Sequence, residues 1–265
     1  MKGVFDMKRI LLFFTCLLML SLNTIRIGAA TREIHWYTVK NKEHKQALVP
    51  GELAEVEKHG GVYIDHRHGD DNPDKIIYLT FDVGYENGNV EKTLNTLKEK
   101  NAPGAFFVLK HFVTERSDLL LRMKAEGHDI CNHTASHKNL ARATGEEIKA
   151  EIEELERAVE SVTGEGTKAY FRPPEGTFSI EMLEHVCALG YKTVFWSFAY
   201  ADWDNQKQPD PQKALEKILC HAHNGAVILL HPTSATNAEI LGDLIDALRK
   251  EGYRFGRLDE LCVAR

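Results

Sequence analysis

From residue 76 onward, the chain alternates short apolar runs with longer segments in which apolar residues recur at helical spacing. Six such helical segments separate runs that have the character of buried β-strands, which are residues 76–81, 104–109, 129–131, 169–171, 193–196, 226–230 and 253–258. Thr144 with Glu147, and Asp210 before Pro211, mark two helix starts. Strands and helices that alternate in this way form right-handed βαβ units around a parallel sheet. The sequence therefore predicts an α/β fold, with an irregular (β/α)7 barrel favoured over an open sheet.

Polar residues of catalytic type follow five of these runs closely. They are Asp82, His133, Arg172, Asp202 and His231. In barrels of βα units the active site forms at the carboxyl ends of the strands, where loops vary without disturbing the core. The pattern predicts that these side chains gather at one rim of the sheet and that the protein is an enzyme.

The first 75 residues lack this alternation. Lys8 and Arg9 precede the uncharged run 10–23, and small residues at 28–30 complete the pattern of a secretory signal. We therefore expect residues 1–30 to be a signal peptide and the protein to be exported, with a retained N-terminal anchor as the alternative. Residues 31–75 are expected to be an N-terminal extension that wraps the catalytic domain, residues 76–265.

Charge argues against a nucleic-acid partner. Acidic side chains outnumber basic ones by 39 to 33, and the formal net charge is −6. Because the expected signal peptide carries a net positive charge, its removal makes the remaining chain more acidic. Such a chain repels the phosphate backbone.

The pair His133 and His137 is the strongest local indication of a metal site. Four residues of separation place both imidazoles on one face of a helical turn, within reach of one divalent ion. A surface pair of histidines has the same spacing, so spacing alone leaves both interpretations open.

An acid and a base accompany this pair. Asp82 is suited to act as base toward a metal-bound water, and His231 to donate a proton to a leaving nitrogen. Asp202 is placed to orient and charge His231, and Arg172 to keep Asp82 ionised. Taken singly, Asp82 could be a helix cap and Arg172 a structural ion-pair partner. Taken together, the set has the parts of a hydrolase.

Five strings along the chain resemble, in order, the motifs of the polysaccharide deacetylase family, also called the NodB-homology or carbohydrate esterase 4 family. They are TFDVG (80–84), HTASH (133–137), RPPEG (172–176), the ADW that ends at Trp203 and the LLH that ends at His231. The resemblance spans about residues 75–260 and implies the deacetylase barrel fold of that family. It also implies hydrolysis of an N-acetyl amide, which releases acetate and a free amino sugar.

The resemblance assigns a role to each matching residue. It implies Asp82 as catalytic base, with Arg172 holding it, and His231 as catalytic acid, tuned by Asp202. His133 and His137 would be the metal ligands.

Looser strings are similar to a branch of the family, the peptidoglycan N-acetylmuramic acid deacetylases that lead to muramic δ-lactam in spore cortex. They are WYTVKN (36–41), TFDVGYENG (80–88), FFVLKHFV (106–113) and TVFWSFAYADW (193–203). This likeness implies peptidoglycan glycan strands as partner, a functional link to a muramoyl-alanine amidase, and a place in the cell wall or the spore intermembrane space. Trp203 and Tyr85 are the expected substrate contacts, because apolar sugar faces suit aromatic rings; for Trp203 a core position is the alternative.

Two other functions stay open at this point. One is an N-acetylglucosamine deacetylase that acts on peptidoglycan or chitin-type chains, and the other is a catalytically silent glycan-binding homologue.

Three positions depart from the family pattern. Val83 stands where most members have an aspartate as third metal ligand, so a divalent metal, zinc or alternatively cobalt or manganese, would bind through two histidines and water, or not at all. The muramic-acid branch also tends to lack that carboxylate. Glu175 replaces an aromatic residue of the third motif, and Ala199 replaces the first aspartate of the fourth.

Overall fold

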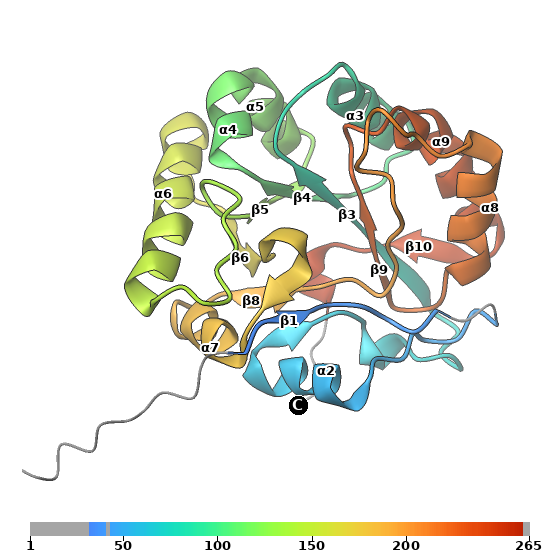
Figure 1. The fold of residues 1–265 in the computed structure, drawn as a ribbon. Helices are drawn as coiled ribbons and strands as arrows, with labels where there is room; N and C mark the ends of the chain where they lie inside the picture. Colours follow the sequence, from blue (N-terminus) through green and yellow to red (C-terminus); the bar gives the residue numbers. More distant parts are fainter. Residues whose placement is uncertain (1–31, 41–42, 262–265) are drawn as a thin grey trace, which may run out of the picture. The chain divides into compact units, whose positions relative to one another are not determined.

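A curled, mainly parallel sheet forms the centre of the computed structural model, which describes residues 32–40 and 43–261 (Figure 1). The strands that belong to this sheet are β2 (Gly61–Val62), β3 (Lys75–Val83), β4 (Ala105–Val108), β5 (Asp129–Asn132), β6 (Lys168–Phe171), β8 (Lys192–Val194), β9 (Ala226–Leu230) and β10 (Tyr253–Phe255). The α-helices are α2 (Gly51–Ala54), α3 (Asn89–Glu99), α4 (Lys110–Glu115), α5 (Ser117–Ala125), α6 (Gly145–Thr163), α7 (Ile180–Ala188), α8 (Pro211–His221) and α9 (Ala235–Lys250). A separate antiparallel pair joins β1 (Ile34–His35) to β7 (Thr177–Phe178).

The strand order is β10-β3-β4-β5-β6-β8-β2, and β9 also pairs with β3. The pairing of β3 with β9 runs from Ile77 to Phe81, whereas β10 meets only the first three residues of β3. After β8, the chain reaches β9 through the isolated bridge Phe198–Ile228 rather than through a continuous ladder. The sheet is therefore curled into an incompletely closed barrel.

The predicted α/β fold is confirmed. Each of the seven predicted strands is present, and the predicted helix starts at Thr144 and Asp210 are real. Thr144 forms a reciprocal capping box with Glu147, and the Asp210 side chain accepts a hydrogen bond from the Lys213 backbone. The sequence analysis missed α4, a six-residue helix directly after β4.

The N-terminal extension contributes to the sheet itself. Strand β2 pairs in parallel with β8, and Ile64 bridges to Ala226 of β9. The Trp36 ring stacks on Phe195, with centroids 4.4 Å apart, while its Nε1 donates to the Trp196 carbonyl at 2.9 Å. The extension and the catalytic segment belong to one compact unit. These pairings fill the gap between β8 and β9.

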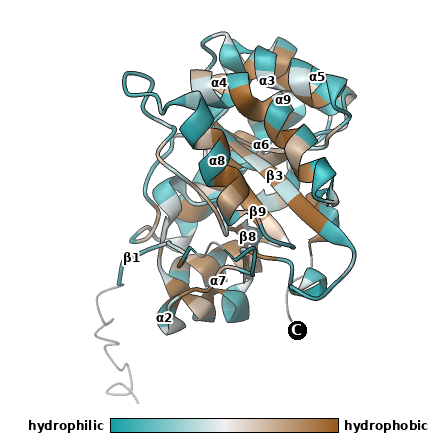
Figure 2. Cartoon of the chain, turned by 90° about the vertical axis from the view of Figure 1, so that its right-hand side faces the viewer, coloured by the Kyte–Doolittle hydropathy of each residue, from teal (hydrophilic) through white to brown (hydrophobic). Residues whose placement is uncertain are grey.

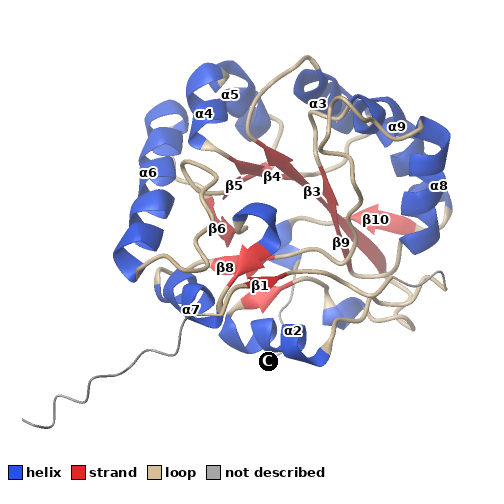
Figure 3. Cartoon of the chain, viewed as in Figure 1, coloured by secondary structure: helices blue, strands red, loops and turns tan. Residues whose placement is uncertain are grey.

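Side chains of β3 alternate between two hydrophobic clusters, as a strand buried on both faces requires. Ile77, Leu79 and Phe81 pack against α3 and α9 on the outside of the sheet, and Ile76 and Tyr78 pack against other strands on the inside. The helices surround the sheet (Figure 3). The helices carry both hydrophobic and hydrophilic residues, and the outer loops are mostly hydrophilic (Figure 2). In the described part of the chain, no helix has the length and apolar character needed to cross a membrane.

Candidate active site

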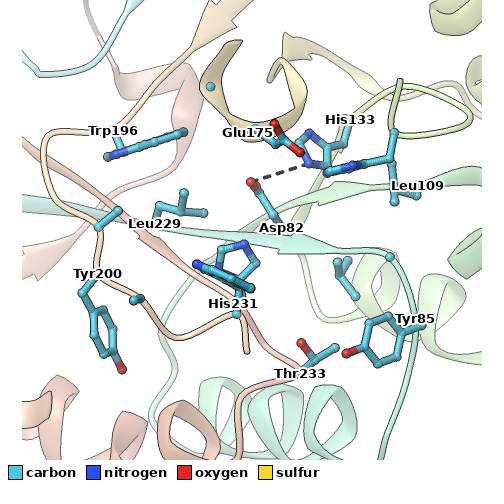
Figure 4. Close-up of a pocket in the computed structure, with 17 residues that line it drawn as sticks. Asp82, Tyr85, Leu109, His133, Glu175, Trp196, Tyr200, Leu229, His231 and Thr233 are labelled. Carbon is cyan, nitrogen blue, oxygen red and sulfur yellow. Dashed lines mark ion pairs between the residues drawn. The ribbon is translucent and has the colours of Figure 1, made fainter. Parts of the chain in front are cut away.

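A pocket of about 760 Å³ opens at the carboxyl ends of β3, β5 and β9 (Figure 4). Asp82, His133, His137 and His231 line it. The other two residues expected at this rim, Arg172 and Asp202, are buried behind the pocket and bond to the residues that line it. Polar side chains at the ends of strands, or in the loops that follow them, thus meet at one place.

Arg172 forms the buried support of the pocket. It follows β6, and its side chain is 0% exposed. The guanidinium donates to the Val194 carbonyl at 2.9 Å and to Thr80 Oγ1 at 3.0 Å, and it lies 4.0 Å from the Phe107 ring centroid. Removing a guanidinium from water is costly unless its donors are paired, and here they are.

Asp82, near the end of β3, completes that ion pair. Its Oδ1 accepts a hydrogen bond from Arg172 Nη1 at 2.8 Å, and its Oδ2 lies 3.7 Å from His133 Nε2. Burial acts to raise the pKa of Asp82, but the charges of Arg172, His133 and His231 outweigh it, and the pKa is lowered. Asp82 is therefore a carboxylate at neutral pH, with one oxygen fixed and the other facing the pocket.

His231, directly after β9, is held by Asp202. Its Nδ1 donates to Asp202 Oδ1 at 2.7 Å, and its backbone N–H donates to Asp202 Oδ2 at 2.8 Å. This leaves Nε2 as the ring atom free for substrate. Burial acts to lower the pKa of His231, but the hydrogen bond and charge of Asp202, with the charge of Asp82, raise it above its ordinary value. His231 is thus protonated more readily than an ordinary histidine, which suits a proton donor.

His133 and His137 lie side by side, but not on a helical turn, so that part of the sequence interpretation was wrong. The segment is a loop after β5, and Thr134 and His137 have positive φ values of 73° and 59°. Short polar side chains define this loop: Asn132 Oδ1 accepts from the Thr134 backbone, and Thr134 Oγ1 accepts from the His137 backbone. The two rings are perpendicular within about 20°, at an interplanar angle of 73°, with centroids 5.1 Å apart.

The hydrogen bonding of His133 suits a metal ligand. Its Nδ1 donates to the Arg172 carbonyl at 2.8 Å, which leaves the Nε2 lone pair directed toward Asp82, as Figure 4 shows. Burial lowers the pKa of His133 to about 4, so the ring is neutral. A neutral imidazole with a free Nε2 is the state that binds metal.

The donor set around these rings is incomplete. Across residues 32–40 and 43–261, no three histidine, cysteine, aspartate or glutamate side chains are grouped as a metal site. Val83 lines the pocket beside Asp82, yet it offers no ligating atom and packs in the core. The two imidazoles fit a divalent cation as a pair, with the third protein ligand missing from this arrangement.

Aromatic residues form the rim. Trp203 is 63% exposed and Tyr85 45% exposed, and both line the pocket, so the alternative of a core position for Trp203 is wrong. The Tyr85 hydroxyl bonds to Asn205, which joins the loop after β3 to the loop after β8. Glu175 and Ala199, the positions that depart from the family pattern, also line the pocket.

Comparison with known proteins identifies the family. A sequence model described as "Polysaccharide deacetylase" matches residues 69–194. The peptidoglycan-N-acetylmuramic acid deacetylase PdaA of Bacillus subtilis is 39% identical over 245 residues, which cover 90% of this chain and 91% of PdaA. This chain belongs to the polysaccharide deacetylase family. The structure of B. subtilis PdaA, a family 4 carbohydrate esterase, matches with a TM-score of 0.82 at 38% identity over 87% of this chain and 97% of that one.

Other solved members of the polysaccharide deacetylase family show how far the likeness extends. A family 4 carbohydrate esterase from Bacillus anthracis matches with a TM-score of 0.68 at 38% identity, over 84% of this chain and 98% of that one. A family 4 pseudoenzyme from the same organism matches with the same TM-score at 26% identity, over 76% of this chain and 68% of that one. Enzymes and a protein without activity thus share this deacetylase fold.

One residue of this polysaccharide deacetylase site escaped the sequence analysis. Asn237, in the first turn of α9, is buried and donates to Asp202 Oδ2 at 2.5 Å and to the His231 carbonyl at 3.0 Å. It fixes both members of the acid pair. Its sequence context is that of an ordinary helix start, capped by Ser234, and gave no signal of this contact.

Proposed function

We propose that the protein removes the N-acetyl group from N-acetylmuramic acid in peptidoglycan glycan strands. The observation that carries the proposal is the presence, in one pocket, of a carboxylate paired with a buried arginine and a histidine hydrogen-bonded to a buried aspartate. The similarity to PdaA, named for this activity, supports the choice of sugar.

The two pairs divide the chemistry of amide hydrolysis. Asp82 takes a proton from the attacking water, whose oxygen bonds to the acetyl carbon. His231 gives its Nε2 proton to the amide nitrogen as the C–N bond breaks, so the products are acetate and an amine. Arg172 and Asp202 touch no reacting atom: Arg172 keeps Asp82 charged, and Asp202 keeps His231 charged and oriented.

A divalent metal would add to this scheme. His133 and His137 are the residues that would hold it, and a bound cation would polarise the acetyl carbonyl and acidify water. Zinc suits a site built on imidazole, with cobalt and manganese as the alternatives.

The biological setting follows the same proposal. We infer export through the signal at residues 1–30, action in the cell wall or the spore intermembrane space, and work in series with a muramoyl-alanine amidase. The free muramic amine is then available to close onto the lactyl carboxyl as a δ-lactam.

The test is acetate release from peptide-stripped glycan strands by the wild type and by Asp82→Asn. We expect the variant to lose acetate release while it still binds the strands. The matched control is Asp204→Asn, which removes a carboxylate outside the pocket lining. Because Asp82→Asn leaves Arg172 without its ion pair, circular dichroism must show that the variant is folded at the assay temperature. A folded wild type that binds strands but releases no acetate would favour the silent glycan-binding homologue.

A further inference from the structure

Residues 196–201, in the loop after β8, form one wall of the pocket and are called the wall segment here. Four of its side chains line the cavity, those of Trp196, Ala199, Tyr200 and Ala201. Strand β9 holds the wall segment from one side. The Ser197 N–H donates to the Val227 carbonyl at 2.9 Å, and the Leu229 N–H donates to the Phe198 carbonyl at 2.9 Å. The other carbonyls of the wall segment need donors from elsewhere, because backbone acceptors inside a protein are rarely left unpaired.

The N-terminal extension supplies those donors. Three of its side chains bond to three carbonyls of the wall segment: Trp36 Nε1 to that of Trp196 at 2.9 Å, Thr38 Oγ1 to that of Ser197 at 2.9 Å, and Lys40 Nζ to that of Ala199 at 2.8 Å. The Lys40 amine also lies 5.2 Å from the Phe198 ring centroid. Side chains of the extension thus do for the wall segment what the backbone of a neighbouring strand does elsewhere in the sheet.

The alternation of residues in the extension produces this arrangement. Trp36, Thr38 and Lys40 occupy every second position, and such positions face one side of an extended chain. The residues between them, Tyr37 and Val39, are 53% and 51% exposed. The Val39 N–H donates to the Leu48 carbonyl at 2.7 Å in an antiparallel bridge, which keeps this part of the chain extended. Figure 1 shows the N-terminal segment, in blue, beside β8.

Trp36 also reaches a second part of the pocket lining. Its backbone N–H donates to the Gly176 carbonyl at 3.0 Å, and β1 pairs with β7 directly after Gly176. A Cβ on Gly176 would lie 2.6 Å from the Trp196 ring and 3.2 Å from the Trp36 Cβ, so these three residues pack without spare room. Gly176 and Trp196 both line the pocket. The extension therefore supports two neighbouring parts of the lining from behind.

Other elements hold the acid pair. Asp202 accepts from Asn237 of α9 at 2.5 Å and from the His231 backbone at 2.8 Å. The Gln208 side chain donates to the Asp202 carbonyl at 3.2 Å. Loosening the contacts of the extension should therefore disturb the wall segment and leave the proton donor in place.

We propose that Trp36, Thr38 and Lys40 are positioning residues of the active site, which hold the wall segment in the shape that binds the glycan. The three residues lie outside the pocket lining and act through the carbonyls that they bond. The functional unit thus includes the extension and does not begin at residue 76. This inference rests on the proposed function only for the identity of the ligand that the wall segment meets.

The first test measures the wall segment without substrate. Thr38→Val keeps the shape of the side chain and removes its donor. In hydrogen exchange followed by mass spectrometry on the full-length chain, we expect the amides of residues 196–201 to exchange about 2- to 10-fold faster, the effect of one lost hydrogen bond. Exchange in β3 should stay unchanged. Adding Lys40→Met should speed exchange of the wall segment by a similar factor again.

The second test separates positioning from stability. With peptide-stripped glycan strands, KM of the double variant Thr38→Val with Lys40→Met should rise about 2- to 10-fold, while kcat and its alkaline limit stay in place. A variant that was only less stable would instead lose kcat in proportion to its unfolded fraction, with KM unchanged. Thr38→Ser keeps the hydroxyl and should recover the exchange rate and KM. Val39→Thr, one position along on the exposed side, is the matched control.

Two outcomes would overturn the proposal. One is unchanged exchange of residues 196–201 in the double variant, and the other is faster exchange with the KM of the wild type. If the wild type released no acetate, the proposed function would fail, whereas exchange and the Kd for glycan strands would still decide this proposal.

Discussion

Replacing Asp202 with asparagine should move the alkaline limit of activity to lower pH. Asp202 is 1% exposed and accepts the His231 Nδ1 proton at 2.7 Å, and its hydrogen bond and charge raise the pKa of His231 against the effect of burial. The substitution removes the charge that favours the imidazolium form. The acid is then lost at a lower pH, because less alkali is needed to deprotonate His231.

The size of the shift follows from the lost interaction. A hydrogen bond to a charged group contributes about 1.5–3 kcal/mol. At 1.36 kcal/mol per pH unit, the alkaline limb of the pH profile of kcat should move to lower pH by about 1 to 2 units. Above both pKa values, kcat of Asp202→Asn should be about 10- to 100-fold below that of the wild type.

The assay is the pH dependence of kcat for acetate release, with Asp204→Asn as the matched charge control. The same linkage affects stability: since folding raises the pKa of His231, the pair stabilises the fold below about pH 6.5 and this contribution is lost as pH rises through the folded pKa. Between about pH 6.5 and the folded pKa of His231, the free energy of unfolding should depend less on pH in Asp202→Asn than in the wild type. An alkaline limb that stays in place in Asp202→Asn would refute the assignment of His231 as the acid.

Three further predictions concern the rim, the metal and the core. Trp203→Ala should raise KM about 2- to 10-fold with little change in kcat, since an aromatic contact contributes about 0.5–1.5 kcal/mol; an unchanged KM for long glycan strands would remove Trp203 from the substrate contacts. Chelation should lower acetate release and added Zn²⁺ should restore it, but not in His137→Ala; full activity in the chelated wild type would contradict a metal role. Phe107→Ala should lower the free energy of unfolding by about 3–5 kcal/mol in urea titration, because Phe107 is 0% exposed in the barrel interior, and a loss under 1 kcal/mol would show that the barrel interior collapses around the cavity.

The strands and most helices could be predicted because their signals are local. Apolar runs bounded by turns and the Thr144 capping box report directly on nearby backbone. The helical reading of His133 to His137 failed because spacing is ambiguous: side-chain bonds of Asn132 and Thr134 to the backbone favour a loop there.

Features that depend on distant pairing had no local signal. Strand β2 is two residues long, and its partner β8 is about 130 positions away. The residues near Gly61 therefore do not predict this pairing. Asn237 reaches Asp202 only because α9 begins behind β9.

The most direct test of the account is to locate the lost acetyl group. Peptide-stripped peptidoglycan strands and chitin oligomers are incubated separately with the protein, and the products are identified by mass spectrometry. We predict that one acetyl group is lost per reacted muramic residue, with the glucosamine residues intact and the chitin oligomers unchanged. Deacetylated glucosamine in the peptidoglycan strands, with their muramic acid intact, would contradict the assignment. Deacetylation of the chitin oligomers with the muramic acid of the strands intact would contradict it as well.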